Sequence, residues 1–226
     1  MNTILLDTLL GIGAIGGSAA VAIAVEIAAR TRLESVTGSF YSIVAVVSGL
    51  LLFGLVAAVL LRVLRSVSPL AEGEHKRPSR AFTRWKLDFN LQESAYRTLG
   101  LFVPVFGRTW LFRLLGARIA SPVVVAGTLT DPAVTRIGRR TIIGGGAFIT
   151  CHVITEDRFS LHPVTLGSGV TIGGGALVMA GVEIGDGAVV SPGSVVLPGT
   201  RIPAYELWAG NPARKITSLR SGAGGQ

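Results

Sequence analysis

The feature that most constrains this chain is an apolar residue that returns every six positions. In the C-terminal half it returns without a break at Leu166, Ile172, Val178, Ile184, Val190, Val196 and Ile202. Each of the first six apolar residues is followed, four positions later, by a small or β-branched residue. Val170 and Ala176 are examples. A helix has a period of 3.6 residues and a strand a period of two, so neither explains a period of six.

A six-residue period predicts very short strands, each of which turns one apolar side chain inward. Three such segments make one triangular coil, and stacked coils bury a continuous core. The same frame appears earlier at Ile137, Ile143 and Ile149, and more weakly at Ile119 and Val125. We therefore predict an all-β parallel β-helix over residues 117–216.

The frame is interrupted once, between Ile149 and Leu166. This interval is seventeen residues, one short of three repeats. The interrupting segment, residues 150–163, contains His152 and His162, two of the three histidines of the chain. Loops held by a rigid scaffold commonly carry function, so we predict the functional site here.

The N-terminal region has two long apolar runs. Thr3–Ala29 is interrupted only by Asp7 and Glu26, and Phe40–Leu61 has no charged residue. Crossing a hydrocarbon core of about 30 Å takes roughly 20 residues, and each run is long enough. No basic segment precedes the first run, which argues against a signal peptide. We predict a transmembrane helical hairpin over residues 1–65.

The positive charge of the chain, +8 in total, is unevenly distributed. The loop between the apolar runs has only Arg30 and Arg32, whereas many basic residues follow the second run: Arg62, Arg65, Lys76, Arg77, Arg80, Arg84 and Lys86. The positive-inside rule then predicts a multi-pass protein of the cell inner membrane with a cytoplasmic C-terminal domain. A solvated basic surface explains the same charges. Nucleic acid is not a predicted partner, because the basic residues are scattered and no recognition motif is present.

Residues 66–116 are predicted to connect the membrane hairpin to the β-helix. Ser66–Arg80 is polar and interrupted by proline, as linkers are. Residues 81–116 mix aromatic and basic side chains, which suits either a membrane surface or a cap on the open end of the β-helix. Residues 217–226 are predicted to be a flexible tail.

The interrupted repeat resembles the hexapeptide-repeat acyltransferase superfamily. Its members place a catalytic histidine in a break before a run like Gly167–Pro198, and end in a Gly-Asn-Pro-Ala segment like residues 210–213. More narrowly, His152 followed by residues 156–158 (Glu-Asp-Arg), and the phrase 110–118, resemble the membrane-embedded C-terminal domains of ε-poly-lysine synthetase. The resemblance implies a left-handed β-helix, a homotrimer and a thioester of CoA or phosphopantetheine as co-substrate, with no tightly bound cofactor.

The function implied by the resemblance is transfer of an acyl or aminoacyl group from CoA or a carrier protein to an amine or hydroxyl. His152 would be the general base, a role that suits a side chain with an ordinary pKa of about 6.5. Glu156 or Asp157 would orient the imidazole or hold a cationic acceptor. A carrier protein or a larger synthetase is a possible partner.

The resemblance also implies donor-binding residues. Gly174, Ala180 and Pro192 match positions where the pantetheine arm passes the main chain, and Arg214 and Lys215 match positions near the nucleotide phosphates. Turn geometry alone explains the glycines equally well.

Other interpretations are open at the same residues. Cys151 suggests a covalent acyl-enzyme, but a small buried side chain is favoured, because neighbours in extended chain point to opposite sides. His162 is interpreted either as a second site residue or as a turn residue, and the turn is favoured. His75 lies outside the coils, so a three-histidine zinc site is not expected and no metal is predicted. A non-catalytic scaffold at the membrane is the alternative function, and it would favour unbroken coils.

Overall fold

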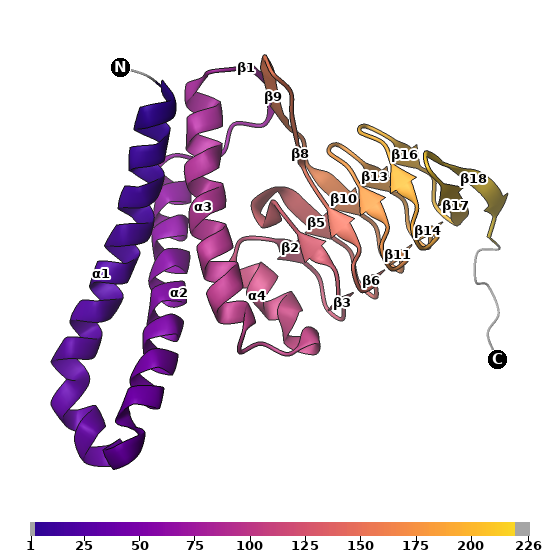
Figure 1. Ribbon diagram of the computed structural model, residues 1–226. Coiled ribbons are helices and arrows are strands. Elements are labelled where there is room, and N and C mark those ends of the chain that lie inside the picture. The colour runs from indigo at the N-terminus through magenta and orange to yellow at the C-terminus, as the bar shows by residue number, and fades with distance from the viewer. Residues whose placement is uncertain (1–2, 220–226) are drawn as a thin grey trace, which may run out of the picture. The chain divides into compact units, whose positions relative to one another are not determined.

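The computed structural model describes residues 3–219, with side chains from residue 9 onward. The chain forms two compact units (Figure 1). The helical unit comprises Met1–Leu70 and Pro78–Pro104, and the β-helical unit comprises Ala71–Arg77 and Val105–Gln226. The predicted connector, residues 66–116, is therefore divided between the units instead of forming one segment.

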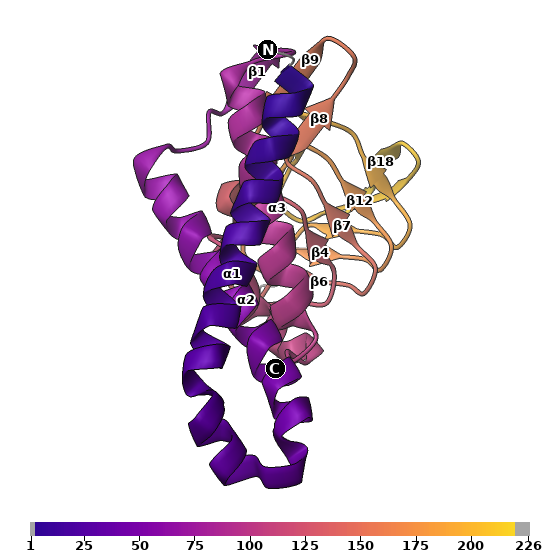
Figure 2. The same cartoon turned by 60° about the vertical axis from the view of Figure 1, so that its left-hand side comes forward.

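The helical unit begins with a hairpin of two long helices, which Figure 2 shows side by side. These are α1 (Thr3–Thr37) and α2 (Tyr41–Val67), joined by the short turn η1 (Gly38–Phe40). Leu9–Val67, which includes the turn, is long and apolar enough to be a candidate membrane span, judged by length and composition. The two helices predicted from the apolar runs are present, and their crossing of a membrane stays a prediction.

A third helix, α3 (Arg80–Gly100), packs against both helices of the hairpin. The Ser79 hydroxyl caps its first turn by accepting a hydrogen bond from the Phe82 amide at 3.3 Å. Its buried residues recur at helical spacing and form one face: Phe82, Trp85, Asp88, Leu91, Gln92, Ala95 and Leu99. Residues 80–100 are thus part of a helical bundle, which the predicted connector did not anticipate.

The β-helical unit consists of three parallel sheets that stack along the coil axis. The first sheet contains β2 (Arg118–Ile119), β5 (Thr135–Ile137), β10 (Val164–Leu166), β13 (Glu183–Ile184) and β16 (Arg201–Ile202). The second contains β3 (Val124–Val125), β6 (Ile142–Ile143), β11 (Thr171–Ile172), β14 (Val189–Val190) and β17 (Glu206–Gly210). The third contains β4 (Thr128–Leu129), β7 (Phe148–Ile149), β12 (Leu177–Val178) and β15 (Val195–Val196).

The predicted inward residues form the core of these coils. Ile172 is completely buried, and its strand neighbours in the stack, Ile143 and Val190, are buried to the same degree. Gly169 and Gly175 sit at the turns with φ of +67°, a conformation that other residues adopt only with strain. The six-residue period therefore has the physical basis predicted from sequence: one buried residue and one tight turn per repeat.

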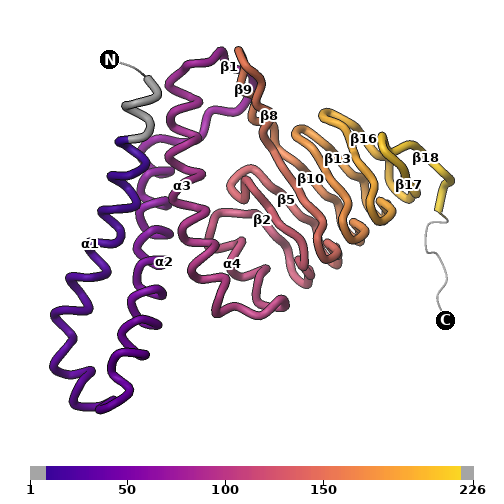
Figure 3. The backbone as a smooth tube through the Cα atoms, viewed as in Figure 1, coloured from indigo at the N-terminus to yellow at the C-terminus, as the bar shows by residue number. Residues whose placement is uncertain are grey.

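The break in the repeat is an inserted antiparallel hairpin, which the backbone trace of Figure 3 follows away from the coils. Its strands are β8 (His152–Ile154) and β9 (Arg158–Leu161). The paired residues Leu166 and Ile184 lie 18 positions apart, whereas the paired residues Ile137 and Leu166 lie 29 apart. The strands before and after the hairpin therefore pair in register. The interval in the sequence is one residue short of three repeats because its length is set by the hairpin.

A third strand, β1 (Gly73–Lys76), pairs with β9 and completes a small antiparallel sheet in the order β1-β9-β8. This strand lies within Ser66–Arg80, which the sequence predicts to be a linker. Its four residues are polar or glycine, and they lack the alternation of apolar residues by which strands are recognised.

Both ends of the coil stack are closed. At the first coil, η2 (Val105–Gly107) leads into α4 (Arg108–Leu114), whose Phe112 is completely buried and whose Arg113 donates to the carbonyls of Ile119 and Ala120. The capping role predicted for this region thus holds for its last part. At the other end, β18 (Ala213–Ser218) pairs antiparallel with β17. The predicted tail therefore begins within a strand, and residues 220–226 lie outside the described residues.

Candidate active site

The inserted hairpin leaves the coils at the corner that follows the third sheet. Leu129, Ile149, Val178 and Val196 are in register across this sheet. The residues two positions after each of them therefore lie at the same corner of successive coils: Asp131, Cys151, Ala180 and Pro198. We call this the site corner. The His162 amide donates to the Cys151 carbonyl at 2.8 Å and closes the base of the hairpin.

His152, the first residue of β8, contacts a buried carboxylate at this corner. Its Nδ1 lies 2.7 Å from Oδ2 of Asp131, and the Asp131 side chain is only 3% exposed. The same oxygen accepts hydrogen bonds from the Cys151 amide at 3.0 Å and from the Thr130 hydroxyl at 2.9 Å. The His152 side chain is 19% exposed, so the imidazole is held by Asp131 and still reaches solvent.

Asp131 was missed by the sequence reasoning. It lies between β4 and the short helix η3 (Pro132–Val134), 21 positions before His152 and outside the interrupted segment. The six-residue frame through Val125 and Ile137 passes through position 131, where an aspartate stands in place of the expected apolar residue. The strand of this coil uses Leu129 instead, two positions earlier, and pairs it with Ile149. A charged residue at an apolar position of the frame is the signal that marks Asp131.

Glu156 and Asp157 lie elsewhere, at the exposed tip of the hairpin. The Asp157 carboxylate accepts from the Thr155 hydroxyl at 3.2 Å and lies 3.5 Å from the Arg158 guanidinium. The carboxylate on the imidazole is that of Asp131, which corrects the predicted orienting role of Glu156 or Asp157. The other predicted role, contact with a cationic acceptor, stays a prediction.

Cys151 is completely buried beside this pair. Its Sγ lies 3.4 Å from the Thr135 hydroxyl. Burial away from water, and then the negative charge of Asp131, raise the pKa of the Cys151 thiol to about 12. Because the thiolate is the nucleophilic form, this environment opposes a covalent acyl-enzyme at Cys151, as expected from the sequence.

A groove of about 480 Å³ lies next to the hairpin, on the side of the later coils. Val153 and Ser160 line it from the hairpin, His162 from the hairpin base, and Ala180 and Gly181 from the site corner. The Gly181 amide donates to the His162 carbonyl at 3.2 Å. His162 is therefore a half-buried residue where the hairpin rejoins the corner, and its side chain faces a space next to Ala180.

The predicted donor-binding residues are not all in one place. Gly174 and Pro192 follow the second sheet, not the third, and occupy a different corner from Ala180. A Cβ on Gly173 would come within 2.3 Å of the Pro192 nitrogen, so the main chains of neighbouring coils meet closely at that corner. Within this chain, Ala180 lies at the site corner and Gly174 and Pro192 do not.

Arg214 and Lys215 lie on β18 at the end of the stack. Lys215 forms an ion pair with Glu206, which also accepts from the Trp208 indole at 2.9 Å. The hydrogen bond from Lys215, and then the one from Trp208, lower the pKa of Glu206. The charge of Lys215 is therefore partly neutralised, and both basic side chains are exposed.

Among the described residues, no three histidine, cysteine, aspartate or glutamate side chains are grouped so that they could hold a metal ion.

Comparison with known proteins identifies the repeat. Residues 163–198 match the family model described as bacterial transferase hexapeptide (six repeats). This segment covers most of the coils that follow the hairpin, and the match confirms the predicted hexapeptide repeat. The repeat also implies the left-handed coil that the sequence resemblance suggested. No curated protein matches the chain significantly.

Several solved structures are similar to this chain. A hexapeptide-repeat acetyltransferase from Vibrio cholerae is 21% identical, with 59% of this chain and 94% of that chain covered and a TM-score of 0.46. A maltose O-acetyltransferase from Clostridium difficile is 23% identical, with 51% and 76% covered and a TM-score of 0.43. A serine O-acetyltransferase from Brucella melitensis is 18% identical, with 75% and 56% covered and a TM-score of 0.43. The narrower resemblance to ε-poly-lysine synthetase stays a prediction.

Proposed function

We propose that this protein is a membrane-anchored acyltransferase that uses His152 as a general base. It moves an acyl or aminoacyl group from a thioester of CoA or a carrier protein to an amine or hydroxyl. The observation that carries the proposal is the 2.7 Å contact between His152 Nδ1 and the buried Asp131 carboxylate, at the corner where the hairpin leaves the coils.

The Asp131 carboxylate selects one tautomer of the imidazole. When Nδ1 donates its proton to Asp131, the lone pair of the ring lies on Nε2. Nε2 removes the proton from the attacking amine or hydroxyl while that group bonds to the thioester carbonyl carbon. As the tetrahedral intermediate collapses, the C–S bond breaks and the thiolate receives the proton from the imidazolium. Asp131 stabilises the imidazolium between these two steps.

The placement of the donor residues supports a homotrimer. Ala180 lies at the site corner, and we assign it to the pantetheine arm that reaches His152 of the same subunit. Gly174 and Pro192 lie at a different corner, so they are assigned to the arm bound beside a neighbouring subunit. Arg214 supplies a cation for the nucleotide phosphates. Lys215 attracts the phosphates less strongly, because its ion pair with Glu206 offsets part of its charge.

The surface of the helical unit supports membrane anchoring through two spans. Ile12, Ile27 and Ile43 are 63%, 69% and 65% exposed, and they belong to a larger set of exposed apolar side chains on α1 and α2. So much exposed apolar surface is unusual for helices surrounded by water but ordinary for helices surrounded by lipid. The excess of basic residues after α2 supports a cytoplasmic position for the catalytic domain at the inner membrane.

A non-catalytic scaffold remains the competing function. A scaffold requires buried apolar coils but does not require a solvent-accessible imidazole bound to a buried carboxylate. Burying a carboxylate costs free energy unless it is paired, so the Asp131 network would destabilise a scaffold without contributing to its function.

The decisive experiment follows thiol release by the purified full-length protein in detergent, with a panel of acyl-CoA donors and amine or sugar acceptors. His152→Ala is expected to lower kcat by roughly 10²- to 10⁴-fold, because the general base is removed. Cys151→Ala, one position away, is the matched control and should keep its activity. Full activity in His152→Ala would overturn the role of His152 as general base, whereas the absence of transfer by the wild-type protein with every donor and acceptor would favour the scaffold.

A further inference from the structure

The segment Ala71–Arg77, here called the strap, lies between α2 and α3 in the sequence but belongs to the β-helical unit. Its strand β1 is in register with β9 over four residues, from Gly73 opposite Leu161 to Lys76 opposite Arg158. Leu161 in turn pairs with His152 on β8. One row of the small sheet therefore runs from the strap through β9 to the proposed general base.

The hairpin needs this third strand. β8 and β9 have three and four residues, and the tip between them is exposed. A two-stranded hairpin is at best marginally stable in water, and a third strand or a packed face is needed for a defined position. The strap supplies that strand.

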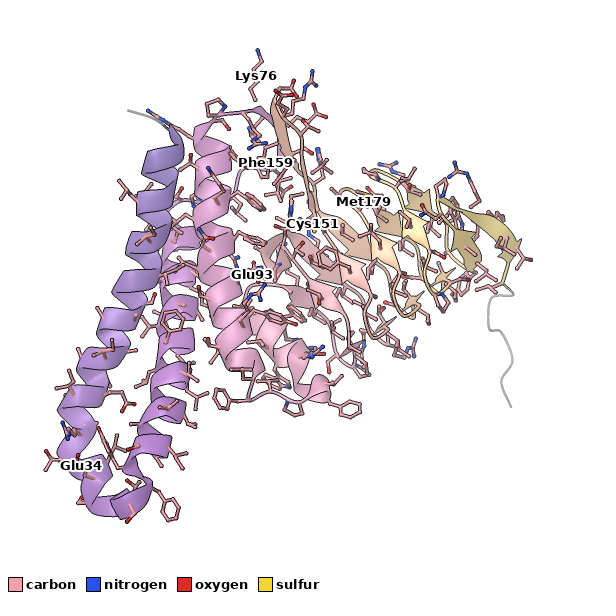
Figure 4. All side chains as sticks on the ribbon, in the orientation of Figure 1. Glu34, Lys76, Glu93, Cys151, Phe159 and Met179 are labelled. Carbon is pink, nitrogen blue, oxygen red and sulfur yellow. The ribbon has the colours of Figure 1, made fainter. Side chains whose placement is uncertain are left out.

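Main-chain and side-chain groups of the strap fasten the hairpin at two further places. The Arg77 amide donates to the Asp157 carbonyl at 2.7 Å, and the Arg77 guanidinium donates to the Thr155 carbonyl, so both hold the tip. The His75 ring stacks on Phe159, with centroids 6.2 Å apart and planes at 22°. Phe159 is completely buried, and Figure 4 shows it on β9 with Lys76 projecting from the strap.

We propose that the strap is part of the active site and that His75 and Arg77 are positioning residues for His152. This inference rests on the proposed function, because it explains how the general base is aligned. Arg77 and His75 of the strap hold the tip and the middle of the hairpin. Gly73 lies opposite Leu161, which pairs with His152. Loss of the strap contacts loosens β9 and with it the pairing that orients β8, and small displacements of a catalytic group reduce rates strongly.

A purely structural role for the strap would have a different signature. The core of the coils consists of residues such as Ile143, Ile172 and Val190, which are completely buried and do not include the strap. Weakening the strap should therefore loosen the hairpin and leave the coils folded.

The test uses the full-length protein with Arg77→Ala and the double variant His75→Ala/Arg77→Ala. We expect kcat to fall by about tenfold in the double variant, with the KM for acetyl-CoA changed by no more than about twofold. Hydrogen exchange should rise at residues 153–160 while the coil amides stay protected. Arg77→Lys retains a cation and should recover part of the rate. Arg139→Ala, which removes an exposed arginine from a coil, is the control.

Unchanged kcat and unchanged exchange at residues 153–160 would overturn the proposal, as would a rate loss that accompanies unfolding of the coils. A separate readout keeps the test independent of activity. The chain has three histidines, so the ring signals of His152 can be assigned in NMR spectra by comparison with His152→Ala. We expect Arg77→Ala to shift these signals. If wild-type protein transfers no acyl group, the proposed function fails, and exchange and ring signals still decide the role of the strap.

Discussion

Each unit of the protein contains a buried aspartate with bound partners, and we propose a structural role for one aspartate and a catalytic role for the other. In the helical unit, Asp88 on α3 is 2% exposed, lies 2.5 Å from Arg65 and lies 3.1 Å from Arg84. In the β-helical unit, Asp131 is 4% exposed and holds His152 at 2.7 Å. Burial and pairing are similar, so neither property by itself distinguishes a structural carboxylate from a catalytic one.

The difference lies in the partners. A guanidinium group does not exchange its protons in ordinary acid–base catalysis, so the Asp88 cluster serves to hold helices together. An imidazole ring has a nitrogen that is able to accept a proton and pass it on, which is the role proposed for His152. Under that proposal, a buried carboxylate becomes useful for catalysis when its partner can exchange a proton and reaches solvent.

The largest effect on stability is expected at Asp88. Asp88→Ala leaves two nearly buried guanidinium groups without their carboxylate and should destabilise the protein by about 3–5 kcal/mol. Thermal or denaturant unfolding of the purified protein measures this loss. Glu93→Ala removes an exposed ion pair with Arg97 on the same helix and should cost at most about 1 kcal/mol. Equal losses in the two variants would show that the Asp88 cluster is not a structural anchor.

At Asp131 the expected loss is in rate more than in stability. Asp131→Asn keeps the shape and an oxygen that accepts from the Cys151 amide, but it no longer stabilises an imidazolium. We expect kcat to fall by at least about 10- to 100-fold, because the neutral amide neither fixes the tautomer of the imidazole nor stabilises its positive charge. Steady-state kinetics on the folded variant measures the change. If Asp157→Asn shows the larger loss, the orienting role returns to the hairpin tip, where the sequence first placed it.

The smallest effect is expected at Cys151, whose thiol pKa is raised to about 12 by burial and by the charge of Asp131. A thiol in an unfolded chain ionises near pH 8.5. Between those values the folded state holds the proton and the unfolded state releases it, so stability falls as pH rises through this window. Alkylation at pH 9 should therefore be slow in the folded protein and fast in denaturant. Rapid alkylation of the folded protein would show an accessible thiolate and reopen the covalent mechanism.

The sequence by itself determined the coils, because each repeat buries its own apolar residue and turns at its own small residue. Ile172 and Val190 follow this local rule, and the break that locates His152 is visible as a departure from it. The apolar runs likewise predicted α1 and α2, since their length and composition are local properties.

Only the tertiary structure decided the partners of the site. Asp131 meets His152 because stacking brings the same corner of successive coils together, and that register is not encoded near either residue. The strap is polar and short, and it forms a strand because it pairs with the edge of β9 that β8 does not occupy. Local patterns fix which residues are buried, whereas contacts between distant segments fix which buried carboxylate holds the imidazole.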